Sequence, residues 1–274
     1  MGIPYAEVIG DPIAHSKSPL IHKFWLEKLG IEGDYRAVRV TAEALPAYLA
    51  LRRLDRDWRG CNVTIPHKQS IRAHLDDLHD YRVGAVNCVL SRDGRLIGEN
   101  TDTEGIGAGL NFLVRTDRPI CVIGAGGSAH AVFATLDILA VYQFNLIARD
   151  RAKAQILLEP HGTNGGAFGF DQAERALDGC IGVINATPLG MDGFPEMPNS
   201  VLRGLSGILR GGFALDLVYS PLETALLAKA REERLKVIDG LTVLIGQAGW
   251  AFRAFFDAIP PNHDDSRIRE LLTR

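Results

Sequence analysis

The sequence has few cysteines, and none of them stands in metal-binding spacing. The four residues Cys61, Cys88, Cys121 and Cys180 are widely separated. Neither a CxxC zinc motif nor a disulfide framework is indicated by this pattern. We therefore expect a protein of the reducing cytoplasm that carries no structural metal.

The sequence also has no excess of positive charge and no long apolar run. Lysine and arginine number 30 against 33 acidic residues, for a net charge of −3. Nucleic-acid binding normally leaves a basic footprint, so we do not expect nucleic acid as a partner. No run approaches the roughly 18 apolar residues of a membrane span, and the N-terminus lacks the basic and apolar segments of a signal peptide. We expect no membrane association.

What the sequence does have is length, glycine and a regular alternation. Its 274 residues, 46% of them hydrophobic and 29 of them glycine, suffice for one large or two small domains without disulfide or metal support. In the first part we predict strands at 3–10, 34–40 and 60–64, helices at 18–30, 43–56 and 68–79, and a hairpin of 85–91 with 95–100 turned at Asp93-Gly94. In the helix at 18–30, Ser18 is the expected N-cap, Pro19 suits the first turn and Gly30 suits the C′ position.

The second part alternates more cleanly between strands and helices. Predicted strands are 120–124, 144–149, 179–187, 212–219 and 236–239, predicted helices are 128–140, 151–159 and 222–233, and predicted loops are 160–170 and 189–200. Such alternation predicts a parallel, doubly wound α/β sheet. The helices expected at 241–258 and 264–273 have no strand of their own to pack on. We expect them to return to the first domain, which would then be discontinuous.

A glycine-rich loop follows the strand at 120–124. Gly124, Gly126 and Ala129 fit the pattern G-x-G-x-x-G/A, and Ala125, Gly127 and Ser128 complete the turn into the next helix. The first glycine suits a tight turn, the second lets the backbone approach a pyrophosphate, and the helix N-terminus favours the anion. This loop therefore predicts a dinucleotide site; the alternative is a tight strand–helix turn without a ligand.

Three residues after the next strand give conflicting signals about the cofactor. Asp150 lies 21 residues after Ala129, where an acidic residue would bind the ribose 2′-hydroxyl of NAD. Arg149 and Lys153 would instead pair with the 2′-phosphate of NADP. The balance of two basic groups against one acid favours NADP, with NAD as the alternative. A solvated helix start, with Asp150 favouring the helix dipole, is the interpretation without a ligand.

Two fragments of the first part carry residues suited to proton transfer. Lys68 ends NVTIPHK (62–68), and Asp102 ends ENTD (99–102) before a predicted helix. From the local sequence alone, Lys68 is equally well a surface lysine, and Thr101 or Asp102 a helix cap.

Seven fragments occur together in a fixed order. They are HSKSP (15–19), NVTIPHK (62–68), GAVN (84–87), GENTD (98–102), GAGGSAHA (124–131), NATPLGM (185–191) and GQA (246–248). This ordered set, which spans nearly the whole chain, resembles the shikimate dehydrogenase family, including the quinate/shikimate dehydrogenases. The resemblance implies NADP-linked reduction of 3-dehydroshikimate to shikimate in aromatic amino-acid biosynthesis. It also implies a substrate-binding domain of residues 1–103 and 240–274, interrupted by a Rossmann-like NAD(P)-binding domain of residues 104–239.

The resemblance assigns roles to individual residues of this sequence. It makes Lys68 the general acid/base and Asp102 its partner, a metal-free way to move the hydroxyl proton. Substrate contacts are expected from Ser16, Ser18, Thr64, Asn87, Asp102, Tyr219 and Gln247. Cofactor contacts are expected from Asn185, Thr187, Pro188, Val218 and Gly240, besides the glycine loop and residues 149, 150 and 153. His15, His22 and His67 are expected to be structural or peripheral.

The sequence also departs from the usual family pattern. Other residues are more usual in the family at six positions, which here are Cys88, His130, Ala148, Asp150, Thr242 and Val243. These positions concern the cofactor site, so an NAD-dependent quinate/shikimate dehydrogenase and a low-activity paralogue remain alternatives. A catalytically silent binding protein on the same fold is the alternative outside the enzymes. We expect a monomer or a homodimer that binds a small molecule.

Overall fold

The chain divides into two compact units. The computed structural model describes residues 2–79, 84–113, 117–161, 165–261 and 266–273. The first unit comprises Met1–Gly105 with Ile245–Arg274, and the second comprises Ile106–Leu244. The limits expected from the sequence lay between residues 103 and 104 and between residues 239 and 240.

The first unit is built on a mixed six-stranded sheet in the order β2-β1-β3-β5-β6-β4. Its strands are β1 (Tyr5–Gly10), β2 (Asp34–Arg39), β3 (Trp58–Val63), β4 (Asp77–Leu78), β5 (Cys88–Arg92) and β6 (Arg95–Glu99). Strands β1, β2 and β3 are parallel, whereas β5 is antiparallel to both β3 and β6. The β5–β6 turn has positive φ at Asp93 (51°) and Gly94 (76°), which confirms the expected hairpin.

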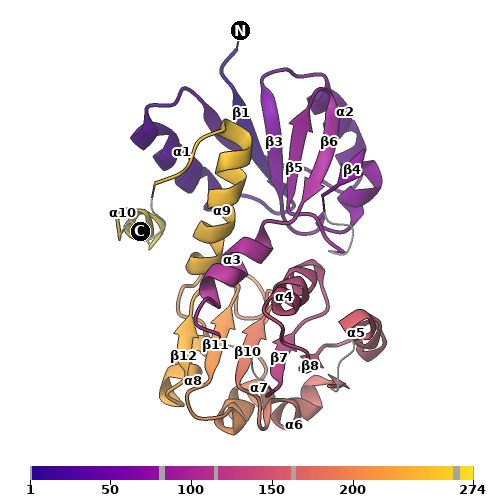
Figure 1. Ribbon diagram of the computed structural model, residues 1–274, viewed down its shortest axis with the longest axis vertical. Helices are drawn as coiled ribbons and strands as arrows, with labels where there is room; N and C mark the ends of the chain where they lie inside the picture. Colours follow the sequence, from indigo (N-terminus) through magenta and orange to yellow (C-terminus); the bar gives the residue numbers. More distant parts are fainter. Residues whose placement is uncertain (1, 80–83, 114–116, 162–164, 262–265, 274) are drawn as a thin grey trace. The chain divides into compact units, whose positions relative to one another are not determined.

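Side chains of this sheet alternate between two cores. Tyr5 and Ile9 of β1 face a cluster that includes Leu45 and Leu49 of α2 (Leu45–Arg53). Ala6 and Val8 face the other side. That side is closed by residues of α9 (Gly240–Phe256), and the helices α1 (Ser18–Leu29) and α10 (Ser266–Thr273) contact each other. All six residues of β1 are buried, as expected for a strand covered on both faces (Figure 1).

Two local predictions in the first unit are wrong. Ser18 is the first residue of α1 and not its N-cap; the cap position is Lys17, which has helical backbone angles and no side-chain cap bond. The helix predicted over 68–79 is a short 3₁₀ turn (Ser70–His74) followed by β4. There, the backbone N–H of Asp76 donates to Leu96 and that of His79 donates to Gly98, so the segment bonds with the β6 strand instead of with itself. Gly30 does end α1 in the left-handed region, with φ of 64°.

The second unit is a six-stranded sheet in the order β12-β11-β10-β7-β8-β9, with every pair parallel. Its strands are β7 (Ile120–Ile123), β8 (Phe144–Ile147), β9 (Ala167–Phe168), β10 (Gly182–Asn185), β11 (Phe213–Asp216) and β12 (Lys236–Ile238). Its helices are α4 (Gly127–Ile138), α5 (Arg151–Leu158), α6 (Ala173–Leu177), α7 (Asn199–Gly204) and α8 (Ala225–Glu232), and α3 (Asp102–Gly109) leads into it. Ile120 and Val122 belong to the core with α4, while Cys121 and Ile123 belong to the core with α6 and α8. Helices thus cover both faces, which confirms the doubly wound sheet (Figure 1).

The predicted loop over 160–170 is partly wrong. Residues Ala167–Phe168 add the edge strand β9 beside β8, and Ala173–Leu177 forms the unpredicted helix α6. The strand is too short to give a periodic pattern, so the flanking glycines dominated the prediction.

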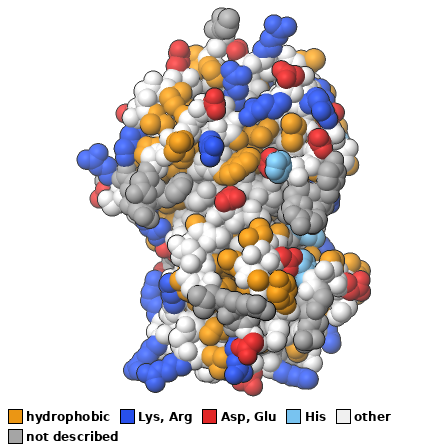
Figure 2. Space-filling view, viewed as in Figure 1, with side chains coloured by type: hydrophobic (Ala, Val, Ile, Leu, Met, Phe, Trp, Pro, Cys, Tyr) orange, Lys and Arg blue, Asp and Glu red, His pale blue; other side chains and the backbone are white. Residues whose placement is uncertain are grey.

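The described residues show no concentration of one charge on the displayed face (Figure 2) and neither a membrane-spanning helix nor a metal site. On the face displayed in Figure 2, basic and acidic side chains are interspersed. Within the described ranges, no helix is long and apolar enough to cross a membrane, and no group of three His, Cys, Asp or Glu side chains is arranged to hold a metal. All four cysteines are buried free thiols.

Candidate active site and cofactor site

The strand ends of the first unit bring the predicted catalytic residues to one edge of its sheet. Lys68 lies in the turn after β3, whereas Asn87 directly precedes β5. The register pairs Asn62 with Cys88, and Cys88 with Glu99. Because β5 is antiparallel to its neighbours, its first residue lies beside the last residues of β3 and β6. Asp102, three residues after β6, reaches the same edge.

At this edge Lys68 and Asp102 form an ion pair. Nζ of Lys68 donates to Oδ2 of Asp102, and each side chain is 14% exposed. The other carboxylate oxygen, Oδ1, accepts a hydrogen bond of 2.7 Å from Nδ2 of Asn87. The carboxylate of Asp102 is therefore held on both oxygens.

Asn87 connects this pair to Gln247 through Thr101. Oδ1 of Asn87 accepts from the backbone N–H of Thr101 at 2.6 Å, and its Nδ2 donates to Oγ1 of Thr101 at 3.0 Å. Oγ1 of Thr101 donates in turn to Oε1 of Gln247 at 3.2 Å. Asn87, Thr101 and Gln247 are 3%, 2% and 6% exposed, respectively. Four of the predicted residues, Lys68, Asp102, Asn87 and Gln247, thus share one network.

Two members of this network have roles that the sequence did not predict. Thr101, expected at most to cap a helix, bridges Asn87 and Gln247. Asn100 accepts from the backbone N–H of Asp102 at 3.1 Å and donates to the carbonyl of Ala85 at 2.9 Å, which fixes the start of α3. An Asn two residues before Asp102 is a signal for such a local side-chain turn.

Ser16, Ser18 and Thr64 also lie at the carboxyl ends of parallel strands. The serines follow β1, Thr64 follows β3, and these strands are adjacent. A Cβ on Gly10 would lie 2.6 Å from Cγ2 of Thr64, so glycine allows the two strand ends to approach. The backbone N–H of Ser18 donates to Oγ of Ser16 at 3.4 Å. Ser18 is buried, whereas Ser16 and Thr64 are partly exposed.

The histidines near these motifs are structural or peripheral, as expected. His22 is fully buried and stacks on Tyr35 with ring centroids 3.9 Å apart, and burial lowers the pKa of its imidazole to about 3. Nε2 of His67 lies 2.7 Å from the carbonyl oxygen of Val40. His15 is exposed.

In the second unit the glycine loop has the geometry of a phosphate-binding turn. Gly124 has φ of +106°, and a Cβ there would lie 2.5 Å from Cγ2 of Thr187. Gly126 precedes the first turn of α4, and a Cβ on it would meet nothing within 4 Å. Ala129 is fully buried against the sheet. The turn is therefore tight at its first glycine and open at its second, where α4 begins, and this fits a pyrophosphate. Ala125, Gly127 and Ser128 are partly exposed in the same turn.

Arg149, Asp150 and Lys153 are exposed at the start of α5. Asp150 is the N-cap of α5, because its Oδ1 accepts a 3.0 Å hydrogen bond from the backbone N–H of Lys153. The acid thus has a structural role, while the two basic side chains make no ion pair within the described part of the chain.

The remaining predicted cofactor residues lie at or just after the carboxyl ends of β10, β11 and β12. Oδ1 of Asn185 accepts from the backbone N–H and from Oγ1 of Thr187, at 3.1 and 2.6 Å. Pro188 is partly exposed and Val218 is buried. A Cβ on Gly240 would lie 2.3 Å from the carbonyl oxygen of Val218, so only glycine fits there. Tyr219, which follows Val218 in the second unit, is partly buried.

Thr242, one of the departures from the usual family pattern, belongs to the start of α9. Its backbone N–H and its Oγ1 both donate to Oδ1 of Asp239, at 3.0 and 3.1 Å. The hydroxyl thus takes part in capping this helix.

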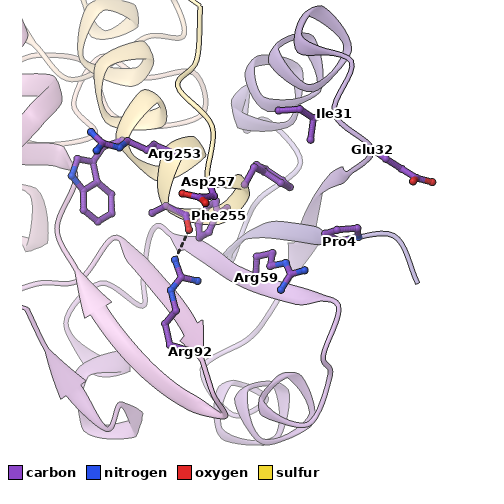
Figure 3. A pocket seen from close by; sticks show the side chains of 11 residues that line it. Pro4, Ile31, Glu32, Arg59, Arg92, Arg253, Phe255 and Asp257 are labelled. Atoms are coloured by element: carbon purple, nitrogen blue, oxygen red, sulfur yellow. Dashed lines mark hydrogen bonds between the residues drawn. The ribbon is translucent and has the colours of Figure 1, made fainter. Parts of the chain in front are cut away.

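A cavity of about 800 Å³ lies elsewhere in the first unit (Figure 3). Pro4 and Arg59 place it at the start of β1 and β3, the sheet edge opposite Lys68. Arg92 donates across it to the carbonyl of Ala254 at 2.5 Å. None of the predicted site residues lines this cavity.

Comparison with known proteins places the whole chain in one family. Residues 8–89 match the family described as shikimate dehydrogenase substrate binding domain. A curated relative from Sphingopyxis alaskensis, named shikimate dehydrogenase (NADP(+)), is 47% identical over 272 residues, covering 98% of this chain and 97% of the relative.

Two solved structures have the same fold. Shikimate 5-dehydrogenase from Thermus thermophilus, in complex with NADP(H) and shikimate, is 36% identical with a TM-score of 0.83 and 98% coverage of both chains. Quinate dehydrogenase from Corynebacterium glutamicum, in complex with NAD, is 28% identical with a TM-score of 0.83 and 98% coverage of both chains. With close identity to a curated relative over nearly its full length, the chain belongs to the shikimate dehydrogenase family.

Proposed function

We propose that this protein catalyses the reversible, NADP-linked reduction of 3-dehydroshikimate to shikimate, a step in aromatic amino-acid biosynthesis. The observation that carries the proposal is the ion pair of Lys68 and Asp102, held by Asn87. Membership of the shikimate dehydrogenase family and the 47% identity to an NADP-linked member support it.

In this proposal Lys68 handles the proton that accompanies hydride transfer. In the direction of reduction, Nζ of Lys68 gives a proton to the oxygen that becomes the hydroxyl; in oxidation it takes that proton back. Asp102 orients Nζ through Oδ2 and keeps its own position through Asn87. General acid–base help of this kind contributes about 10²–10⁴-fold to a rate.

The neutral polar residues of the first unit suit the substrate. Ser16 and Ser18 offer hydroxyl donors for its carboxylate, while Thr64, Asn87 and Gln247 can both donate to and accept from ring hydroxyls. Tyr219 of the second unit is proposed as a further hydroxyl donor. The substrate is a small anion, and with a near-neutral net charge of −3 the protein would hold it by a few placed hydroxyls and not by a basic surface.

The glycine turn of the second unit has the residues needed to bind a dinucleotide. Gly124, Gly126 and the N-terminus of α4 would hold the pyrophosphate, and Arg149 and Lys153 would pair with a 2′-phosphate. The wall beside the nicotinamide would be formed by Asn185, Thr187, Pro188, Val218 and Gly240. When bound, NADP(H) supplies or accepts the hydride.

We propose residues 1–103 and 240–274 as the substrate domain and 104–239 as the cofactor domain.

A two-substrate, two-cofactor kinetic matrix tests the proposal. Purified protein is mixed with shikimate or quinate and with NADP or NAD, and absorbance of the reduced nicotinamide is followed. We expect the highest kcat/KM with shikimate and NADP. Quinate oxidation with NAD at a higher kcat/KM would instead establish a quinate/shikimate dehydrogenase, and turnover in none of the four mixtures would refute both.

We further propose that the enzyme works in the cytoplasm, where its four buried thiols stay reduced. Light scattering during size-exclusion chromatography separates the two expected oligomeric states, monomer and homodimer.

A further inference from the structure

Asp216 is a fully buried carboxylate at the end of β11 to which the proposed mechanism gives no part. It makes no ion pair within the residues that the structure describes. A buried carboxylate without a counter-charge is costly unless hydrogen bonds satisfy it, so its surroundings indicate what it is for.

Three donors satisfy this carboxylate, and each belongs to a different segment. Oδ1 accepts from Nδ2 of Asn185 at 2.9 Å and from the backbone N–H of Val218 at 3.0 Å. Oδ2 accepts from Oγ1 of Thr224 at 2.7 Å. Asp216 therefore joins the end of β10, the chain after β11 and the start of α8.

The bond to Asn185 extends into the segment after β10. Asn185 accepts from Thr187 and donates to the carbonyl of Leu189 at 3.2 Å, and the backbone N–H of Leu189 donates to Oγ1 of Thr187 at 3.1 Å. Asn185 thus folds residues 185–189 into a closed turn. The methyl group of Thr187 borders Gly124 of the glycine loop.

We infer that Asp216 is a positioning residue for cofactor binding, which fixes the 185–189 turn and the Val218 N–H without touching the cofactor itself. This inference rests on the proposed NADP-linked function. Its physical reason is that one ionised carboxylate accepts from both segments through the same atom, Oδ1, so that the two proposed cofactor contacts are set relative to each other.

The bond to Thr224 supplies a matched control within the same network. Thr224 caps α8 by accepting from the backbone N–H of Leu227 at 3.2 Å, and it bonds to the other carboxylate oxygen. Thr224→Val removes that branch and leaves Oδ1 with Asn185 and Val218. Asp216→Ala removes both branches.

The experiment compares binding of NADPH, by nicotinamide fluorescence, in wild type, Asp216→Ala and Thr224→Val. Binding of shikimate and the thermal midpoint are measured on the same samples. We expect Asp216→Ala to raise the Kd for NADPH by about tenfold or more, the scale of lost hydrogen bonds to a charged group, with the Kd for shikimate unchanged. Thr224→Val is expected to lower the thermal midpoint but to raise the Kd for NADPH by less than about threefold.

Equal weakening of NADPH binding in both variants would overturn the inference, because it would show general destabilisation. Unchanged NADPH binding in Asp216→Ala would also overturn it. If Asp216→Ala does not fold, Asp216→Asn is used with hydrogen exchange at the amides of Thr187 and Leu189. Faster exchange there than at Leu227 supports the inference, and no difference overturns it.

Failure of the proposed function is distinguishable. A wild-type protein that binds NADPH but does not oxidise shikimate refutes that function and leaves the binding comparison decisive. A wild-type protein that binds no NADPH overturns both.

Discussion

Lys68 donates a hydrogen bond to Asp102, and the two side chains are equally exposed to solvent, at 14% each. They are 34 residues apart in sequence: Lys68 lies in the turn after β3, and Asp102 is the first residue of α3, which follows β6. Their meeting depends on antiparallel β5, which lies between β3 and β6.

Replacing Lys68 by Ala should remove the proton-transfer group. We expect kcat for shikimate oxidation to fall by about 10²–10⁴-fold. Binding of NADPH should not change, because Lys68 belongs to the first unit and the glycine loop to the second. Steady-state kinetics and nicotinamide fluorescence measure the two effects. Lys23→Ala, which removes an exposed lysine paired with Asp34 at 3.2 Å in the same unit, is the control. Full turnover by Lys68→Ala would rule out its role as acid and base.

Replacing Asn87 by Ala should damage both stability and activity. Its amide satisfies Oδ1 of Asp102 and the buried N–H of Thr101, and each group left unpaired costs about 1–3 kcal/mol. We expect a lower free energy of unfolding in urea and a lower kcat/KM for shikimate. Asn145→Ala in the second unit, which loses a 2.6 Å bond to the carbonyl of Ala176, should lose stability without weakening shikimate binding. Equal shikimate kinetics in the two variants would show that Asn87 only supports the fold.

Replacing Asp150 by Thr should raise the preference for NADP over NAD. Thr can cap α5 as Asp150 does, but it carries no charge to repel a 2′-phosphate. We expect the ratio of kcat/KM values, NADP over NAD, to rise by about three- to tenfold. Arg149→Ala should lower the same ratio. An unchanged ratio in Asp150→Thr would mean that this carboxylate does not face the ribose.

The second unit was predictable because each of its main strands carries its own signal. The apolar run 120–124, the glycines after it and the helix that follows specify a parallel strand–turn–helix unit locally. The short elements β9 and α6 were missed because two to five residues give no periodicity. The active-site network was predictable only in part. Lys68, Asp102, Asn87 and Gln247 stand in recognisable motifs, whereas the bridging role of Thr101 depends on contact with a residue 146 positions away.

Asp102 and Asp150 also show that local sequence does not predict a contact made over a long distance in the chain. Both acids stand next to a helix start in the sequence. Only the pairing of strands decides that Asp102 meets the lysine of the turn after β3, while Asp150 bonds to its own helix. Local sequence determines the capping by Asp150, and long-range topology determines the partner of Asp102.

Replacing Asp216 by Asn should change how stability depends on pH. Burial raises the pKa of the Asp216 carboxyl from 3.8 to about 6, although hydrogen bonds from Thr224, Val218 and Asn185 oppose this shift. Between these two values the folded state binds more protons than the unfolded state, so the free energy of unfolding falls as pH rises from about 4 to about 6. Above pH 6, where Asp216 is ionised in both states, the free energy of unfolding has fallen by roughly 3 kcal/mol, which corresponds to a shift of about two pKa units. In Asp216→Asn this contribution is absent, so the variant should gain stability relative to wild type over that window. Urea unfolding of both proteins between pH 4 and 7 measures the difference, in which the contributions of all other carboxylates cancel. Parallel stability curves for the two proteins would show that Asp216 titrates normally.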